Sequence, residues 1–343
     1  MSLKDTRISA TPKSSSNSSR PLVSIVIPAH NEAHLVGGCI TSVFANDWPR
    51  DQLEVFVIDH QSSDATATIA QAAGARVIHQ TRDKKIGAIR NAGLNAARGE
   101  FVAYVDADCT VPQTWLRSAI TILGSHSDVG AVGGPCLSPS DGTWVEKCLA
   151  LTHVIPGTAK PVTALATSSF IAPTKLLLDI GKFNEIVYSG EDDDISNRIR
   201  QRGLTLVSAS DCHIVHHGYP RTLSAVAKKE MWHGSNHIDV RSKFDLILIL
   251  TFIFLISALS TIPMLMYAFF RPSQLAFDAV YALGLLHFTP PLLYVLKRVR
   301  QDPTDWRLAL PTLAVGYAYF IGHSIGVIDN LWRRLTAIAA WSS

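Results

Sequence analysis

The chain has 343 residues, a formal net charge of +3 and a sequence pI near 8.6. This length suits one large domain or two smaller ones, and the near balance of charge excludes a typical nucleic-acid-binding protein. The five cysteines are scattered and form no CxxC pair, which argues against a disulfide framework or a zinc site and favours a reducing compartment.

The first 20 residues are polar and rich in serine. They lack the apolar core of a secretory signal peptide. We therefore predict a disordered tail over residues 1–20 and a cytosolic start to the chain.

Residues 21–240 alternate between short apolar segments and segments with helical spacing. The predicted strands cover 22–28, 53–59, 75–79 and 100–108, and the predicted helices cover 32–45, 64–75 and 87–99. Asp64 stands where a helix N-cap is expected, and Gly99 where a helix ends. This order predicts an α/β fold whose sheet is mixed but mostly parallel, with helices on both faces.

Polar residues follow three of the predicted strands. The segment "PAHNE" (28–32) ends the first strand, Asp59 ends the second, and Asp106 and Asp108 end a later one. In parallel sheets, ligands bind beyond the carboxyl ends of the strands. The sequence thus predicts a binding site at this edge of the sheet.

Asp106 and Asp108 are candidate metal ligands. Side chains two positions apart on a strand point the same way, so both carboxylates can face one point. Mg²⁺ and Mn²⁺ prefer oxygen ligands, and one or two carboxylates with substrate phosphates are enough to hold Mg²⁺. The alternative for this pair alone is a solvated turn in which the aspartates cap the strand end.

Four ordered motifs extend this interpretation. They are "SIVIPAHNE" (24–32), "VIDHQSSDAT" (57–66), "KKIGAIRNAGLNAARGEFVAYVDAD" (84–108) and "GEDDDISNRIRQRG" (190–203). Together they make the chain resemble the inverting family 2 glycosyltransferases with the GT-A, Rossmann-like fold, over roughly residues 22–217. The resemblance implies a nucleotide-sugar donor and a divalent metal, Mg²⁺ or Mn²⁺, on Asp106 and Asp108.

The resemblance also implies nucleotide-sugar contacts, which fall on Pro28, His30, Glu32, Asp59, Lys85, Arg90 and Asp106. Asp59 matches the acid that binds the uracil ring of a UDP-sugar, and Lys85 and Arg90 match a basic segment near the diphosphate. The sequence departs from the family at His60 and Gln61, which leaves the preference for uridine open. Taken singly, Asp59 could instead cap a turn and Arg90 could be a solvated helix residue.

Four consecutive acids, Glu191–Asp194, open a predicted helix. The positive end of the helix dipole explains one or two of them, but neighbouring like charges make the ionised form of each acid less stable. By the family pattern Asp192 is the catalytic base, and Glu191 positions Asp192 or the acceptor. Asp194 and Arg198 are spaced to form an ion pair on the same helix.

The segment 216–237 is the predicted acceptor side. Its "KKEMW" (228–232) keeps the tryptophan of the processive synthase motif Gln-x-x-Arg-Trp but not its Gln or Arg, which favours single-sugar transfer. Trp232 could stack on a sugar or lie against a membrane interface. His216 and His217 point to opposite faces of a strand, so a shared ion is not expected, but one of them is a candidate contact for the metal or the diphosphate.

The C-terminal region, 241–343, is predicted to be a membrane domain of two to three helices. The candidate spans are 246–270, 275–296 and 308–328; Asp278, His287 and Pro290–Pro291 weaken the second, and the third could instead be interfacial. The basic segment "KRVRQDPTDWR" places the loop before the third span in the cytoplasm. The catalytic domain is then cytoplasmic too, and the chain is an integral membrane protein.

We therefore predict a membrane-anchored inverting glycosyltransferase that acts on a hydroxyl or lipid-linked acceptor in polysaccharide, glycolipid or cell-envelope synthesis. Within the same chemistry, the alternatives are a polyprenyl-phosphate glycosyl synthase and a processive polysaccharide synthase. A nucleotidyltransferase would need a glycine-rich phosphate-binding loop near the first strand. The segment "PAHNEAHLVGG" (28–38) is not such a loop. A non-catalytic membrane scaffold would be favoured by loss of the key acids, but Asp106, Asp108 and Asp192 are all present.

Overall fold

The structure is a computed structural model that describes residues 20–81, 85–150, 154–187, 190–237, 246–301 and 306–341. The chain forms two compact units: Met1–Pro139 with His153–Gly218, and Ser140–Thr152 with Tyr219–Ser343. Residues 219–237, which the sequence grouped with the catalytic domain, pack with the C-terminal helices. The predicted tail up to residue 19 and the predicted boundary at residue 240 lie outside the described residues.

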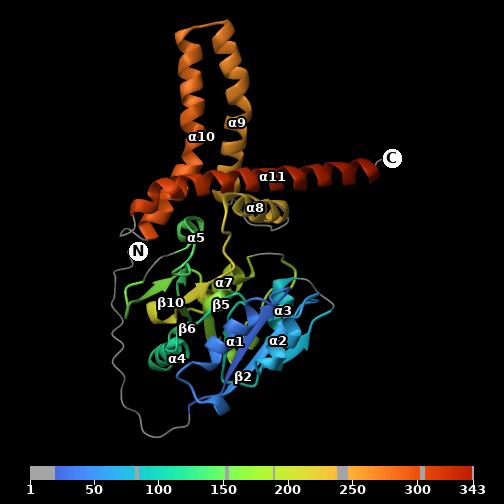
Figure 1. Ribbon diagram of the computed structural model, residues 1–343, viewed down its shortest axis with the longest axis vertical. Helices are drawn as coiled ribbons and strands as arrows, with labels where there is room; N and C mark the ends of the chain where they lie inside the picture. The colour runs from blue at the N-terminus through green and yellow to red at the C-terminus, as the bar shows by residue number, and fades with distance from the viewer. Residues whose placement is uncertain are drawn as a thin grey trace. The chain divides into compact units, whose positions relative to one another are not determined.

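The first unit is built on an eight-stranded sheet of order β3-β2-β1-β4-β9-β6-β10-β8 (Figure 1). Its strands are β1 (Val23–Ala29), β2 (Leu53–Asp59), β3 (Arg76–His79), β4 (Phe101–Tyr104), β6 (Val129–Gly133), β8 (Ala159–Val162), β9 (Phe170–Pro173) and β10 (Thr205–Ala209). Neighbouring strands are parallel from β3 to β4 and again between β6 and β10, whereas β9 and β8 run antiparallel to their neighbours. The mixed, mostly parallel sheet is confirmed.

Six helices flank this sheet: α1 (Val36–Phe44), α2 (Thr66–Ala72), α3 (Ile86–Ala96), α4 (Trp115–Ser125), α6 (Thr174–Asp179) and α7 (Glu191–Gln201). Two separate cores form because alternate strand residues face opposite sides. One core joins β1 to α1 and α4, with Ile40 and Trp115 fully buried. The other joins β1 and β4 to α3, α6 and α7. Helices on both faces are confirmed.

The predicted strand 100–108 is shorter in the structure. It ends at Tyr104, and a turn follows in which the Cys109 amide donates to the Asp106 carbonyl at 3.0 Å. The chain then enters a second, three-stranded sheet of order β5-β11-β7, made of β5 (Cys109–Thr110), β11 (Ile214–His216) and β7 (Cys136–Leu137). Asp106 and Asp108 therefore lie in the turn between the two sheets.

Within the described residues, four short 3₁₀ helices cover Arg50–Gln52, Thr167–Ser169, Ser210–Cys212 and Trp306–Leu308.

The second unit is helical: α5 (Trp144–Leu149), α8 (Leu223–His237), α9 (Leu246–Phe270), α10 (Gln274–Gln301) and α11 (Ala309–Trp341). Helices α9 and α10 form an antiparallel hairpin, and α11 runs across its base beside α8 (Figure 1). By length and composition α9, α10 and most of α11 are each sufficient to cross a membrane. Helix α10 continues through Pro290 and Pro291.

Candidate active site

The carboxyl ends of the central strands bring the predicted residues to one edge of the main sheet. In the parallel register Ala29, the last residue of β1, pairs with Asp59, the last residue of β2. Strand β4 lies on the other side of β1 and leads into the turn that carries Asp106 and Asp108. His30 and Glu32 follow β1 directly, so they enter the same edge.

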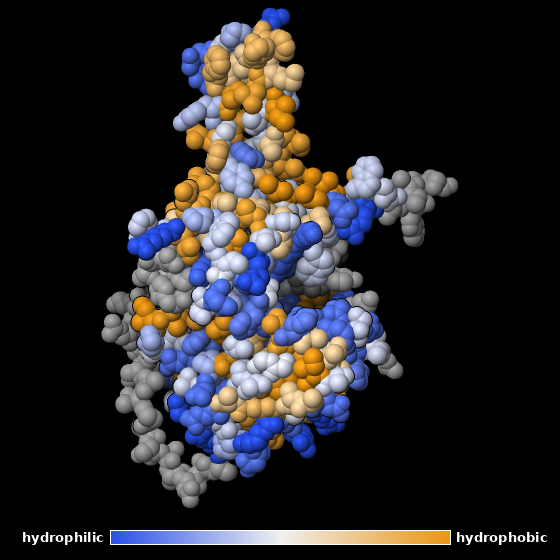
Figure 2. Space-filling model, viewed as in Figure 1, coloured by the Kyte–Doolittle hydropathy of each residue, from blue (hydrophilic) through white to orange (hydrophobic). Residues whose placement is uncertain are grey.

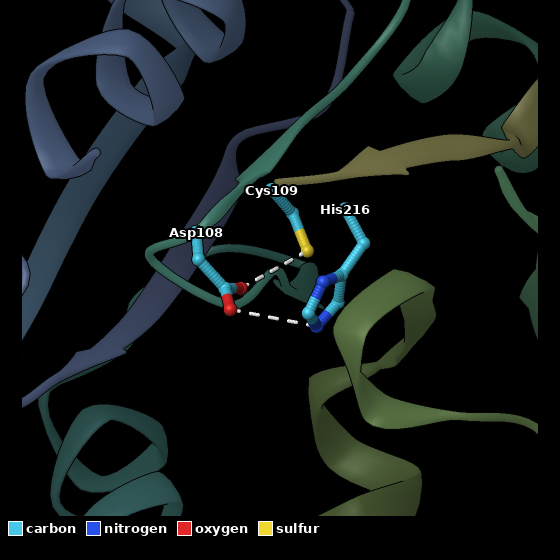
Figure 3. Close-up of side chains that lie close together, drawn as sticks. All are labelled: Asp108, Cys109 and His216. Carbon is cyan, nitrogen blue, oxygen red and sulfur yellow. Dashed lines mark hydrogen bonds and ion pairs between the residues drawn. The ribbon is translucent and has the colours of Figure 1, made fainter. Parts of the chain in front are cut away.

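Asp108 stands at the centre of a small cluster of potential ligands (Figure 3). Its Oδ2 lies 3.4 Å from Nε2 of His216, and its Oδ1 lies 3.4 Å from Sγ of Cys109. One ligand atom from each of the three residues lies within 4.8 Å of the others. The antiparallel pairing of β11 with β5, which sets His216 opposite Cys109, creates this arrangement.

His217 lies apart from this cluster. Its backbone amide donates to the Asp108 carbonyl at 2.8 Å, and its Nε2 lies 3.1 Å from the Thr110 hydroxyl. The two adjacent imidazoles thus contact different groups, as the alternation of side chains on a strand predicts. The structure separates the two histidine candidates and places His216 at Asp108.

The cluster contains side-chain atoms that can act as ligands of a divalent cation. Carboxylate oxygen and imidazole nitrogen both bind Mn²⁺, and the Asp108 and His216 side chains are only 18% and 15% exposed. Burial raises the pKa of the Cys109 thiol well above its usual range, which keeps the sulfur protonated and a donor to Asp108. Gly218 lies beside Asp108 and has no side chain to fill the space there. A Cβ at this position would lie 1.9 Å from Asp108 Oδ2.

Arg90, on α3, connects Asp106 to the helix that carries the candidate base. Its Nη2 donates to Asp106 Oδ1 at 3.2 Å, and its Nη1 donates to Glu191 Oε1. The Arg90 side chain is only 5% exposed. The prediction placed Arg90 near the diphosphate; in the structure its contacts hold two acids of the site in place.

Glu191 and Asp192 differ in environment although they are adjacent. Glu191 is buried against Arg90, and this burial raises its pKa in spite of the opposing charge of the guanidinium. Asp192 is half-buried, and its Oδ1 accepts a hydrogen bond from the Asp193 amide at 2.9 Å. Asp194 and Arg198 form the predicted ion pair. Asp192 is thus more accessible to a reacting group than Glu191.

Asp59 carries a buried carboxylate oxygen that is a candidate ligand contact. Its side chain is 6% exposed, and its Oδ2 lies 3.0 Å from Nδ1 of His79. Among the residues that the structure describes, the buried Oδ1 has no hydrogen-bond partner. Since buried carboxylate oxygens are normally paired, this atom is a candidate acceptor for a donor group of a ligand.

The segment after β1 completes this side of the site. Pro28 is buried within β1 opposite Ile58, and His30 is exposed, with Nδ1 2.5 Å from the His60 carbonyl. Burial raises the pKa of Glu32 to about 7, and the nearby charges of Asp108, Asp64 and Asp106 add to the shift. Glu32 therefore shares an electrostatic environment with both candidate metal ligands. Lys85 directly precedes α3, the helix of Arg90.

Comparison with known proteins agrees with this geometry. Residues 24–173 match the sequence model described as Glycosyl transferase family 2. Residues 24–173 therefore form a family 2 glycosyltransferase domain. Its fold is GT-A: a mannosyltransferase from Pyrobaculum calidifontis, solved with GDP-Man and Mn²⁺, aligns with a TM-score of 0.56 over 92% of this chain and 88% of its own, at 20% identity.

Two curated relatives each align with about two thirds of this chain. Glycosyltransferase AglE of Haloferax volcanii is 27% identical to this chain, over 65% of this chain and 75% of the length of AglE. Pre-mycofactocin glycosyltransferase of Mycobacterium tuberculosis is 26% identical over 66% of the chain and 49% of its own length. The chain therefore spans three quarters of one relative and about half of the other.

Two residues of the glycosyltransferase site were not singled out from the sequence. Cys109 directly follows the Asp106–Asp108 motif, and Gly218 directly follows His216–His217. Each is adjacent to a predicted site residue, which is the signal that could have identified it. Trp232, predicted on the acceptor side, lies on α8 with 56% of its surface exposed and its ring 5.0 Å from that of His233.

Proposed function

We propose that this glycosyltransferase moves a sugar from a nucleotide-sugar to a hydroxyl of a lipid-linked or saccharide acceptor, with inversion at the anomeric carbon. One observation carries the proposal: Asp106 and Glu191 bind the same guanidinium. One candidate metal ligand, Asp106, and the residue before the candidate base therefore meet around Arg90. This arrangement suits a reaction in which the leaving diphosphate and the attacking hydroxyl approach one carbon atom.

Asp106 and Asp108, together with the His216 imidazole, would hold Mg²⁺ or Mn²⁺. The bound cation would offset the negative charge of the diphosphate leaving group. Support comes from the ligand atoms of Asp108 and His216, which already converge, and from the space that Gly218 leaves beside them. In this proposal the Cys109 thiol donates to Asp108 and orients its carboxylate.

Asp192 would act as the general base. Its carboxylate takes the proton of the acceptor hydroxyl while the acceptor oxygen forms a bond to the anomeric carbon. The bond from that carbon to the diphosphate oxygen breaks, and its electron pair leaves with the nucleoside diphosphate. The single displacement inverts the configuration. Glu191, held by Arg90, fixes the first turn of α7 and so positions Asp192.

Asp59 would recognise the nucleotide base through its buried Oδ1, which has no partner among the described residues. Uracil and guanine both present ring N–H groups to such an acceptor, so both UDP-sugars and GDP-sugars are compatible with it. Pro28, His30 and Glu32 would line the base and ribose, with Lys85 toward the diphosphate. The Pyrobaculum protein was solved with GDP-Man, which makes GDP-sugars as important to test as UDP-sugars.

The long apolar helices support a lipid-linked acceptor presented at a membrane. We place the catalytic unit on the cytoplasmic side because Arg298 and Arg300 lie in the last turn of α10 and the positive-inside rule favours the cytoplasm for such residues. Some relatives are named for polysaccharide synthesis, such as the succinoglycan biosynthesis protein ExoO of Rhizobium meliloti, 37% identical over 29% of each chain. Synthesis of a polysaccharide, glycolipid or cell-envelope component is therefore the proposed role. Trp232 remains the candidate acceptor contact on α8.

A nucleotide-release assay tests this function. Full-length protein in detergent is given UDP- and GDP-sugars with Mg²⁺ or Mn²⁺, with and without membrane lipid extract. We expect release with one donor that requires metal, and loss of at least about 100-fold in Asp192→Asn, the scale of general-base catalysis. Asp193→Asn, an exposed acid on the same turn, is the matched control and should stay active. Equal activity of both variants would remove Asp192 from the mechanism.

A further inference from the structure

Helix α11 packs against α8 through glycines at its centre. A Cβ on Gly322 would lie 2.2 Å from the Ala227 carbonyl oxygen, and one on Gly326 would lie 2.1 Å from that of Met231. One turn later Asn330 Nδ2 donates to the Ser235 carbonyl at 2.6 Å. The backbones of α8 and α11 therefore touch directly, as small residues spaced four apart allow.

Helix α8 is too polar for the hydrocarbon core of a bilayer. Lys228 and Lys229 are exposed on it, next to Glu230. If α11 crossed the membrane, its centre would carry this part of α8 to the middle of the bilayer. Lysine is among the residues that are most costly to insert at that depth. The α8–α11 contact is thus incompatible with a spanning α11.

The opposite face of α11 is apolar and exposed within the part of the chain that the structure describes. Its exposed side chains recur at helical spacing on one face: Ile321, Ile325, Ile328, Trp332 and Leu335, each between 46% and 67% exposed. We call these five residues the α11 stripe. Such a face, opposite a polar partner, is typical of a helix that lies in the plane of a membrane interface.

The α11 stripe is continuous with the α9–α10 hairpin. Tyr317, one turn before Ile321, has its ring 5.8 Å from that of Phe254 on α9 and 5.7 Å from that of Phe288 on α10. The hairpin thus meets α11 on the face of the stripe, while α8 covers another face. Figure 2 shows apolar side chains over the hairpin that continue along α11.

The hairpin has the dimensions of two membrane crossings. Helix α9 has 25 residues and α10 has 28. At about 1.5 Å per residue both exceed the roughly 30 Å of a hydrocarbon core. Arg298 and Arg300 lie in the last turn of α10, at the base of the hairpin, where the positive-inside rule favours the cytoplasm.

We propose that α9 and α10 cross the bilayer, and that α11 does not cross but lies along the membrane–water interface with its stripe in the lipid. In this arrangement the lipid bilayer covers the α11 stripe. Two crossings return the chain to its starting side, so both termini lie on the cytoplasmic face. Arg333 and Arg334, which a third crossing would place on the outer side, then lie beside Trp332 at the headgroups.

Reporters on the full-length chain test the number of crossings. One epitope is fused to the C-terminus, a second to the N-terminus, and a third is inserted in the loop 271–273. We expect the two terminal epitopes on the same side of intact vesicles and the loop epitope on the other. A C-terminal epitope on the side of the loop would establish a third crossing and overturn the proposal.

Photo-crosslinking identifies what covers the stripe. A benzoylphenylalanine is placed at Ile325 in the full-length protein within native membranes, with Lys228 as the control position on α8. We expect lipid adducts at 325 in clear excess over 228. A crosslinked dimer without lipid adduct would assign the stripe to a second copy of the chain and overturn the lipid assignment. Neither readout depends on activity, so failure of this proposal is distinct from failure of the proposed reaction.

Discussion

Arg90 and Glu191 form a buried ion pair between side chains that are only 5% and 9% exposed and 101 positions apart in the sequence. The pair fixes the first turn of α7 against α3. Because the same guanidinium also binds Asp106, we expect a change at Arg90 to disturb this candidate metal ligand and, through Glu191, the turn that carries the candidate base.

Removal of this guanidinium should cost both stability and activity. We expect Arg90→Met to lower the free energy of unfolding by about 3–5 kcal/mol, because Glu191 is left buried without its partner. The double variant Arg90→Met/Glu191→Leu should regain most of that stability but little activity, since Asp192 stays unpositioned. Urea unfolding in detergent and the release assay measure the two effects. A loss below about 1 kcal/mol, the size of an exposed pair, would contradict this role.

Asp59 should control nucleotide affinity without affecting the metal. Asp59→Asn replaces a charged acceptor, and a hydrogen bond to a charged group contributes about 1.5–3 kcal/mol, which corresponds to roughly 10- to 100-fold in affinity. Calorimetric titration with UDP and GDP measures the change, and Mn²⁺ binding without nucleotide should stay the same. His79→Ala, which removes the exposed neighbour of Asp59, should have a much smaller effect. Similar losses in both variants would show that His79 also contacts the base.

The space beside Asp108 should be essential for metal binding. A Cβ on Gly218 would overlap Asp108 Oδ2, so Gly218→Ala should displace the carboxylate and weaken Mn²⁺ binding at least about tenfold, or 1.4 kcal/mol. Gly124→Ala on α4 is the matched control, since a Cβ there meets nothing within 4 Å. Electron paramagnetic resonance of free Mn²⁺ gives both affinities. Unchanged binding in Gly218→Ala would place the metal away from Asp108.

Glu32 should make the metal-free protein sensitive to pH. The folded pKa of about 7 lies above the ordinary glutamate value of 4.5, so the folded state holds this proton more tightly than the unfolded state. The stabilising effect of that proton is fully present below pH 4.5 and is lost as pH rises to 7. The melting temperature of Glu32→Gln should therefore exceed that of the wild type by more at pH 8 than at pH 5. A constant difference would mean that Glu32 has an ordinary pKa.

Close helix packing in the second unit should not tolerate a methyl group. Gly326→Ala would bring a Cβ against the Met231 carbonyl, and overpacking of this kind costs about 1–3 kcal/mol. Gly284→Ala, on α10 where a Cβ meets nothing within 4 Å, carries the same chemical change and should be neutral. Thermal unfolding in detergent compares the two. Equal melting temperatures would show that α8 and α11 do not touch at Gly326.

The fold, and the sheet edge that holds the candidate site, could both be predicted from the pattern of residues alone. Apolar runs separated by helical segments define parallel strands, and such strands bring Asp59 and Asp106 to one edge whatever the loops do. It also placed Asp194 and Arg198 together, because four positions on a helix are neighbours by local geometry.

Only the tertiary structure decided how these residues are used. The family resemblance assigned Arg90 to the diphosphate, and that assignment stays a prediction; local spacing could not show that Arg90 also contacts Glu191, 101 positions away. The sequence could not choose between His216 and His217, since the choice depends on how β11 pairs with β5. Likewise, apolar length alone made α11 a candidate span, whereas its contact with the polar helix α8 exists only in the folded chain. Local spacing fixes local structure, but partners distant in sequence are chosen by packing.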